Sequence, residues 1–421
     1  MTERETSAFP ESTSPANRNT TLRGETPFAS RPADPASMHV LLAFDKFKDA
    51  LDANQACECA SSALRERHPN WTFDACPLTD GGDGFSSILT KAASGETVRR
   101  TATGPRGDPV ETSFGVVSFA KIPSAARALL PLEQTPERIA VVELASASGL
   151  ARLKPDARDP WQTTTLGTGE LLRLAALHPG VGAILLGVGG SATNDLGLGV
   201  LAALGLEFRT AGGEKVHPPV PARWKEISTI GGALLPELPP VFIACDVTNV
   251  LLGQKGAAAV YGPQKGLRPE DLRRLENESA QIALMLCGHC SQPDSLMDVP
   301  GTGAAGGTPF GLIAAAGAKI LPGSELVSAW LDLDTRLAAA DVVVTGEGRF
   351  DDSSLTGKGP GAVVARALAF GLPVHVFAGD VSVSHARHGL KLHPITPPGM
   401  PLANALAEAP ALLAAAIRNA F

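Results

Sequence analysis

The sequence is poor in aromatic residues and has no long hydrophobic run. Aromatic side chains are 5% of the 421 residues, one of them is a tyrosine, and the formal net charge is −7. A surface that binds nucleic acid is basic and stacks bases on aromatic side chains, so we expect no nucleic-acid partner. Charged residues or glycines interrupt every stretch of about 18 residues, so we also expect no membrane span.

Residues 1–37 lack the apolar core of a secretory signal. They are rich in serine, threonine, proline, glutamate and arginine, and such a segment cannot bury enough apolar surface to offset the entropy of ordering. We therefore predict a disordered N-terminal extension at residues 1–37 and a cytoplasmic protein. The folded pattern begins at Met38, and the sequence does not decide between Met1 and Met38 as the start of translation.

The chain has six cysteines, which a cytoplasmic protein keeps reduced. Cys287 and Cys290 have the spacing of a dithiol redox motif, but such a motif follows a strand and opens a helix. Here the pair ends a helix-periodic stretch, and one pair cannot supply the four ligands of a structural zinc site. We interpret the spacing as a coincidence at a helix end.

Glycine and proline are abundant, with 44 and 34 residues, and they punctuate short apolar runs. Most of these runs are continuous rather than alternating, as in strands that are covered on both faces. We predict strands at residues 39–44, 72–78, 139–144, 183–188, 241–244, 341–345 and 374–378. We predict helices at residues 53–67, 84–93, 168–177, 196–204, 270–286, 309–318, 362–369 and 404–419. This alternation predicts doubly wound parallel sheets.

Residues 98–119 break the alternation, because they form two alternating strands around a turn at residues 104–109. This pattern predicts an antiparallel hairpin. A single core stops growing at about 250–300 residues, so the chain should hold more than one. We predict two α/β domains: one with a doubly wound parallel (Rossmann-like) sheet at residues 38–95 plus 300–421, and an inserted mixed α/β domain at residues 96–299.

Acidic residues follow five of the predicted strands, at the strand ends where parallel sheets bind ligands. The five acidic residues are Asp45, Asp80, Asp195, Asp246 and Glu347. The polar residues and glycines near them are Lys46, Lys48, Gly81, Gly82, Gly189, Gly190, Ser191, Asn194 and Arg349. A single such acid is often a helix cap. Five that converge would repel one another without a cation, and Mg²⁺ with phosphate oxygens suits such a site. Basic residues, including Lys358, would bind anionic groups, so the set suits phosphoryl transfer.

The glycine-rich turn at residues 187–192 leaves an alternative open. It leads from a predicted strand toward a predicted helix, whose free N–H groups would attract phosphate. It also nearly matches the dinucleotide fingerprint G-x-G-x-x-A, with Glu207 at about the right distance downstream. Polar residues 193–195 follow, where a dinucleotide-binding helix packs apolar residues, and this disfavours the match. Residues 357–359 are not a P-loop, because glycine follows the lysine in place of serine or threonine.

Nine short motifs occur in one order between residues 38 and 400. They are FDKFKDAL at 44–51, TDGGDG at 79–84, ELASASGL at 143–150, TLGTGEL at 165–171, GGSATND at 189–195, DVTN at 246–249, YGPQKG at 261–266, GAAGG at 303–307 and TGEGRFD at 345–351. Together they resemble the motifs of the bacterial glycerate kinase family, of the glycerate 2-kinase type. The resemblance implies transfer of the γ-phosphoryl group of ATP to glycerate, with 2-phosphoglycerate as the usual product.

Three positions depart from the pattern of that family. Lys46 stands where the family has serine, Asp49 where it has glycine, and Leu196 where it often has glycine. None of these changes removes a charged group that the reaction needs. Lys46 adds a cation, which we expect to alter the affinity for the acceptor.

Charge and position suggest roles for the site residues. We predict that Asp195, or as second choice Asp80, accepts the proton of the glycerate hydroxyl, and that Asp195→Asn lowers turnover with the fold intact. Lys48 would neutralise the glycerate carboxylate or the transferring phosphoryl group, and Asp246 and Glu347 would bind Mg²⁺. The predicted substrate- and phosphate-binding residues are Asp45, Gly81, Gly82, Gly189, Gly190, Ser191, Asn194, Arg349 and Lys358.

The predicted cofactors are therefore ATP and Mg²⁺, and the predicted partners are glycerate and a nucleotide. An NAD(P)-dependent oxidoreductase that acts on a small 2-hydroxy acid stays an alternative, and a non-catalytic sensor is a third. The sequence does not decide the product isomer, the stereochemical or nucleotide preference, or whether the protein is an oligomer.

Overall fold

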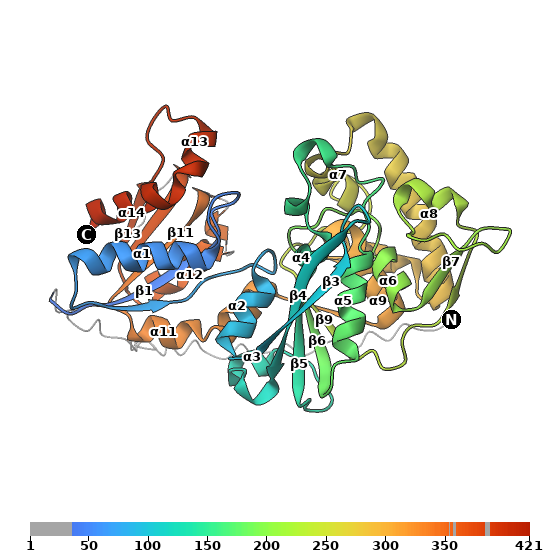
Figure 1. Ribbon diagram of the computed structural model, residues 1–421, viewed down its shortest axis with the longest axis horizontal. Coiled ribbons are helices and arrows are strands. Elements are labelled where there is room, and N and C mark those ends of the chain that lie inside the picture. The colour runs from blue at the N-terminus through green and yellow to red at the C-terminus, as the bar shows by residue number, and fades with distance from the viewer. Residues whose placement is uncertain (1–35, 353, 357–358, 384–387) are drawn as a thin grey trace, which may run out of the picture.

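The structure is a computed structural model that describes residues 36–352, 354–356, 359–383 and 388–421. The predicted extension at residues 1–37 lies almost wholly outside the described residues, and so does Lys358. Two lobes lie side by side, each built on one large β-sheet with helices around it (Figure 1). In the described part of the chain, no helix is long and apolar enough to cross a membrane.

The first lobe holds a five-stranded sheet in the order β13-β12-β11-β1-β2, in which every pairing is parallel. Its strands are β1 (His39–Phe44), β2 (Thr72–Ala75), β11 (Val342–Asp351), β12 (Val374–Ser382) and β13 (Leu390–Pro394). Its helices are α1 (Ala53–Arg67), α11 (Leu333–Ala339), α12 (Gly359–Ala369), α13 (Leu402–Ala407) and α14 (Ala409–Ala420). Side chains alternate along β1, since Val40 and Leu42 pack with α1 and α14. Leu41 and Ala43 pack on the other face with α11 and α12, which makes this sheet doubly wound.

The second lobe holds a six-stranded sheet in the order β10-β9-β6-β5-β4-β3. Its strands are β3 (Glu96–Thr103), β4 (Pro109–Ser118), β5 (Arg138–Glu143), β6 (Val181–Gly187), β9 (Val241–Ala244) and β10 (Lys319–Leu321). The β3–β4 hairpin is antiparallel, as the sequence predicted, and β4 also runs antiparallel to β5. The other pairings are parallel. The predicted fold class, one doubly wound parallel sheet and one mixed α/β sheet, is confirmed.

The remaining helices lie between the two sheets or in the second lobe. They are α2 (Phe85–Ala92), α3 (Ser124–Ala128), α4 (Ala145–Ser148), α5 (Leu166–Ala176), α6 (Leu198–Leu204), α7 (Ala257–Tyr261), α8 (Leu272–Cys290), α9 (Thr308–Ala316) and α10 (Gly323–Trp330). Cys287 and Cys290 lie in the last turn of α8, the helix end at which the sequence placed them. Both are free thiols.

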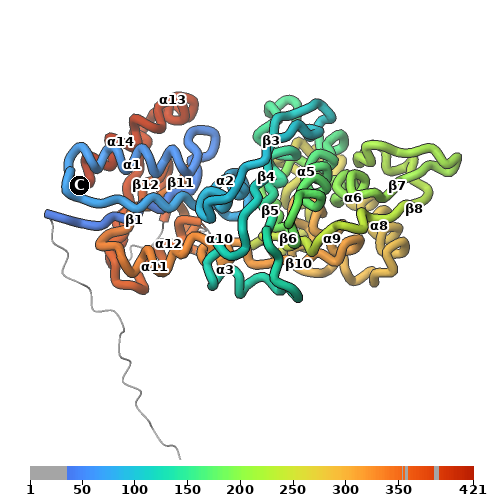
Figure 2. The backbone as a smooth tube through the Cα atoms, turned by 60° about the horizontal axis from the view of Figure 1, so that its bottom comes forward, coloured from blue at the N-terminus to red at the C-terminus, as the bar shows by residue number. Residues whose placement is uncertain are grey.

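One hydrophobic core runs between the two sheets. It joins Leu41 and Val343 of the first sheet to Val141 and Leu185 of the second through residues of α2 and α10, which lie between the sheets (Figure 2). The indole N–H of Trp330 donates to the carbonyl of Leu89 at 3.0 Å and ties these two helices together. All strands of the second sheet lie within residues 96–321, and those of the first lie within residues 39–75 and 342–394. The division into domains at residues 95 and 300 stays a prediction.

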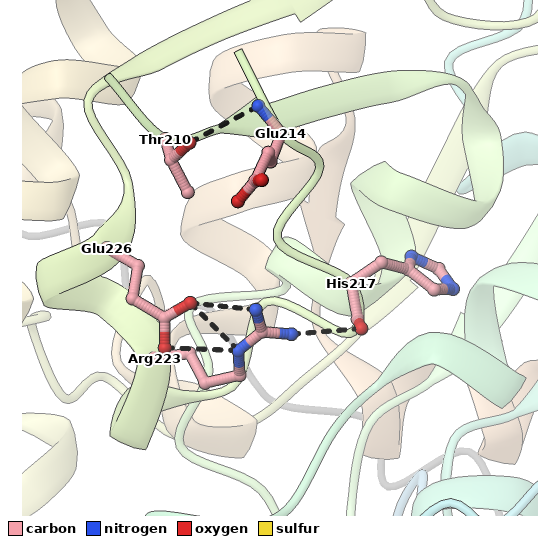
Figure 3. Close-up of polar contacts among 5 residues, drawn as sticks. All are labelled: Thr210, Glu214, His217, Arg223 and Glu226. Atoms are coloured by element: carbon pink, nitrogen blue, oxygen red, sulfur yellow. Dashed lines mark hydrogen bonds and ion pairs between the residues drawn. The ribbon is translucent and has the colours of Figure 1, made fainter. Parts of the chain in front are cut away.

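A separate core, which we call the third core, lies at the far end of the second lobe. There α6, α8 and α9 pack on a small antiparallel sheet of β7 (Leu206–Arg209) and β8 (Thr229–Gly232). The connection between these strands is held by polar contacts (Figure 3). Arg223 donates to Glu226 Oε2 at 2.7 Å and to the His217 carbonyl at 3.1 Å. Glu214 N–H donates to Thr210 Oγ1 at 3.2 Å. These contacts close the loop locally and leave it apart from the site described next.

Candidate active site

A cleft of about 550 Å³ is lined by residues that follow strands of both sheets, and we call it the inter-sheet cleft. Segments after β1, β2, β6 and β9 contribute to its wall, as do the turns around residues 261–265 and 304–305. The structure brings six of the predicted site residues together along this wall: Lys48, Asp80, Gly189, Gly190, Ser191 and Asp246. Strand ends that are far apart in the sequence therefore meet at one surface.

Lys46 lies between the carboxylates that follow β1 and β2. Its Nζ is 3.9 Å from Asp45 Oδ1 and 3.8 Å from Asp80 Oδ1. Burial raises the pKa of Asp45 to about 6, against the effect of Lys46, while Asp80 and Asp83 add to the rise. Burial alone would lower the pKa of Lys46, but the neighbouring carboxylates outweigh it and the pKa is raised. One ammonium group thus offsets several acids.

The glycine turn after β2 touches the glycine turn after β6. Gly189 N–H donates to the Gly81 carbonyl at 2.9 Å, and a Cβ on Gly189 would lie 2.6 Å from Gly82 Cα. Gly81 has a φ of +91°, and a Cβ there would lie 3.0 Å from the Ala244 carbonyl oxygen. Close packing of the two turns is therefore a reason for glycine at position 189, and the left-handed backbone is a reason for glycine at position 81, independent of any ligand.

Glu347 lies on β11, next to the end of β1, because the two strands pair with Phe44 opposite Gly346. Burial raises the pKa of Glu347 to about 7; a hydrogen bond with Ser354 opposes this, and the charge of Asp45 adds to it. Glu347 Oε1 is buried and has no hydrogen-bond partner among the described residues. An orphaned carboxylate oxygen beside a second carboxylate fits a divalent cation. No group of three or more histidine, cysteine, aspartate or glutamate residues in the described chain is placed to hold a metal.

Asp246 lines the inter-sheet cleft, but both of its carboxylate oxygens already accept hydrogen bonds. Ser324 N–H donates to Oδ2 at 2.9 Å and to Oδ1 at 3.1 Å, and Ser324 Oγ donates to Oδ1 at 3.2 Å. Asp246 therefore caps the N-terminus of α10 from another segment of the chain. Asp246 follows β9 of the second sheet, whereas Glu347 lies on β11 of the first sheet and does not line the cleft. The structure therefore does not bring the two predicted metal ligands together in the cleft lining.

Asp195 is fully buried beneath the cleft wall. It accepts hydrogen bonds from Thr165 N–H at 2.7 Å, Thr165 Oγ1 at 2.9 Å, Gly197 N–H at 3.2 Å and Gly199 N–H at 3.3 Å. Burial raises its pKa, against these hydrogen bonds. In the first turn of α6, Gly199 N–H thus donates to Asp195 and Val200 N–H donates to Thr165 Oγ1 at 3.0 Å, so these groups are not open to an anion at the glycine turn. This burial counts against the predicted role of Asp195 as the base, and Asn194 beside it is also buried.

Arg349 lies apart from the inter-sheet cleft. Its side chain is 66% exposed, and its Nε is 3.5 Å from Asp351 Oδ2 and 3.6 Å from Asp380 Oδ2. The structure therefore does not place Arg349 with the residues predicted to bind phosphate, and the prediction for Lys358 falls outside the described residues.

Several charged residues at or beside the cleft were not predicted as site residues. Lys265, Arg158 and Asp83 line it, and burial raises the pKa of Asp83, against the effect of Lys46. Glu143, at the end of β5, has its pKa raised to about 7 by burial, although Ser86 N–H donates to its Oε2 at 3.2 Å. Asp83, Glu143 and Lys265 lie in three of the quoted motifs, so motif membership could have suggested them.

Residues 40–421 match the model of the Glycerate kinase family. The chain belongs to the glycerate kinase family. Among other members, it is similar to the glycerate kinase of Halalkalibacterium halodurans, with 36% identity over 387 residues that cover 90% of this chain and 96% of the relative. It is also similar to the glycerate 2-kinase of Escherichia coli, with 34% identity over 363 residues that cover 84% and 89%.

A solved structure agrees with membership of the glycerate kinase family. A crystal structure from Salmonella typhimurium LT2, assigned as a glycerate kinase 2, matches this fold with a TM-score of 0.70 at 35% identity. The match covers 91% of this chain and 97% of the other. These findings do not support the alternative of an NAD(P)-dependent oxidoreductase.

Two departures from the glycerate kinase motifs lie at left-handed backbone positions. Asp49 has a φ of 62° and Leu196 a φ of 55°, a region that glycine adopts most easily. This conformation explains why glycine suits both positions. Aspartate tolerates it better than most residues, whereas buried Leu196 packs in the third core.

Proposed function

We propose that this protein transfers the γ-phosphoryl group of ATP to glycerate in the inter-sheet cleft and releases ADP and 2-phosphoglycerate. Membership of the glycerate kinase family supports the reaction and the acceptor. The observation that carries the site is Lys46 between Asp45 and Asp80, where turns from both sheets meet. Phosphoryl transfer depends on positioning and charge neutralisation, which such a group supplies.

Asp45, which lies 3.9 Å from the cleft-lining Lys46, and Glu347 would hold the Mg²⁺ that accompanies the nucleotide at the edge of the inter-sheet cleft, since neither residue is part of its lining. Burial raises the pKa of both carboxyls; the charges of Asp80 and Asp83 add to the rise at Asp45, and the charge of Asp45 adds to the rise at Glu347. A cation beside them would oppose that effect. Mg²⁺ needs only one or two protein carboxylates when phosphate oxygens and water complete its shell. The ion, when bound, neutralises charge on the phosphate oxygens.

Asp80 would accept the proton of the glycerate hydroxyl. Its Oδ1 accepts from Gly82 N–H at 3.2 Å, and its side chain is 43% exposed at the cleft, so an acceptor can reach it. As the hydroxyl oxygen bonds to the γ-phosphorus, the bond from that phosphorus to the bridging oxygen of ADP breaks, and the proton passes to Asp80. Lys48, exposed on the same wall, would neutralise the glycerate carboxylate or the transferring group.

A coupled assay of ADP release tests this proposal. We expect ADP release to require both glycerate and Mg²⁺, to stop when the metal is chelated, and to occur without any change in nicotinamide absorbance. NMR of the product against authentic 2- and 3-phosphoglycerate identifies the isomer. An absence of ADP release with glycerate, tartronate and related hydroxy acids would refute the kinase assignment.

A further inference from the structure

Lys265 is a lysine buried in the wall of the inter-sheet cleft. It ends the short helical turn Pro263–Lys265 and is 2% exposed. Its Nζ donates to Ser191 Oγ at 2.9 Å and to the Thr193 carbonyl at 2.7 Å. Burying an ammonium group costs free energy unless hydrogen bonds satisfy it, so a lysine here has a role that an apolar side chain could not fill.

The contact with Lys265 determines what the Ser191 hydroxyl can do. A lysine ammonium has three donors and no acceptor, whereas a hydroxyl has one donor and two acceptor sites. Ser191 Oγ must therefore accept from Lys265, and its own proton points elsewhere. Over the ranges that the structure describes, Ser191 Oγ has no second hydrogen-bond partner, and Ser191 lines the cleft. The hydroxyl is free to donate to a ligand there.

We propose that Lys265 fixes the Ser191 hydroxyl as a hydrogen-bond donor to an anionic oxygen of the cleft ligand, either the carboxylate of glycerate or a phosphate of the nucleotide. The inference rests on the proposed function. Ser191 contacts the ligand, and Lys265 is the positioning residue behind it.

The charges around Lys265 suit an anion in the cleft. Arg158 also lines the cleft, its Nη1 lies 3.5 Å from the Gln264 carbonyl, and its buried Nε has no partner among the described residues. Burial lowers the pKa of Lys265 to about 7, against the effect of Asp195. An anion near Ser191 favours the charged form of Lys265. The ammonium has no acceptor and can only donate to Ser191, whereas a neutral amine could also accept from it.

Steady-state kinetics of Ser191→Ala, Lys265→Met and the double variant test the inference. We expect each single variant to raise the KM of one substrate about tenfold, as expected for one lost hydrogen bond to a charged group, with kcat within about threefold. A higher KM for glycerate assigns the carboxylate, and a higher KM for ATP assigns a phosphate. The double variant should match Ser191→Ala, because Lys265 acts through Ser191.

Two results would overturn the inference while the unaltered enzyme still releases ADP: an unchanged KM for both substrates in Ser191→Ala, or fully additive effects in the double variant. The KM values of Ser191→Ala test the inference even if Lys265→Met does not fold. Leu413→Ala is the control for lost stability, since Leu413 is fully buried in the first lobe, in the core that α1 and α14 share. It should lower the melting temperature and leave both KM values unchanged. An enzyme without ADP release would instead refute the proposed function itself.

Discussion

Replacing Asp195 by asparagine separates a structural carboxylate from a catalytic one. Oδ2 of Asp195 accepts three hydrogen bonds, from Thr165 N–H, Thr165 Oγ1 and Gly199 N–H, and Oδ1 accepts one from Gly197 N–H. Asparagine has one acceptor oxygen, and its amide nitrogen can only donate. With the oxygen on the Thr165 side, the amide group would face the N–H of Gly197, donor against donor.

The expected cost follows from these contacts. A hydrogen bond to a charged group contributes about 1.5–3 kcal/mol, and a buried unsatisfied donor costs about 1–3 kcal/mol. Asp195→Asn loses one such bond and weakens three, so we expect the free energy of unfolding to fall by about 3 kcal/mol. Because Asp195 is 0% exposed, the folded variant should keep its kcat within a few-fold.

Asp80→Asn is the matched variant with the opposite expectation. The side chain of Asp80 is exposed at the cleft, so the substitution should change the free energy of unfolding by less than about 0.5 kcal/mol. Its kcat should fall by about 10²–10⁴, the usual contribution of a general base. Urea unfolding followed by tryptophan fluorescence and the ADP-release assay measure the two effects. An Asp195→Asn variant with full stability and a thousandfold lower kcat would refute this reasoning.

Three further predictions concern the cleft and its surroundings. Lys46→Met removes the cation between Asp45 and Asp80, so the KM for glycerate should rise about tenfold; unchanged steady-state kinetics would contradict this. Asp49→Gly relieves a φ of 62°, so the free energy of unfolding should rise by about 0.5–1 kcal/mol, and a lower melting temperature would count against it. The pKa of Glu143 is raised from 4.5 to about 7, so its contribution to stability is complete below pH 4.5 and is lost as the pH rises through 7. Between pH 4.5 and 7, the free energy of unfolding of the unaltered protein should fall by an amount of the order of 3 kcal/mol, and that of Glu143→Gln should lack this fall. If the free energy of unfolding changes with pH in the same way in both proteins, Glu143 has an ordinary pKa.

The sequence predicted best the elements with strong local patterns. The bounds of β1, α1 and β9 agree with the predicted residues 39–44, 53–67 and 241–244. For the strands, continuous apolar runs end sharply at charged or polar residues. For α1, Asp52 and Gln55 form a capping box that fixes the helix start.

The elements that the sequence missed are short or depend on distant contacts. β10 has three residues and β13 lies at a sheet edge, so neither carries a long apolar run. The helix predicted at residues 404–419 is two helices, α13 and α14, which are separated at Glu408, and Pro410 lies in the first turn of α14. Tertiary packing decides such breaks, and periodicity alone does not show them.

The site was predicted in outline but not in detail. The rule that ligands bind beyond strand ends selected Lys48, Asp80 and Ser191, which the structure places along one cleft. It could not tell which carboxylates face the cleft, and Asp195 faces inward. The contact from Lys265 to Ser191 spans 74 positions, so no local pattern indicates it.

The first sheet has a consequence for synthesis on the ribosome. β1 pairs with β11, and His39 N–H donates to Asp341 Oδ2 across 302 positions. When β1 and β2 emerge, one flank of β1 therefore stays unpaired until the last part of the chain has been made. All strands of the second sheet lie within residues 96–321 and can assemble earlier. A nascent chain that stalls before β11 exposes an apolar strand edge, which is the state most in need of a chaperone.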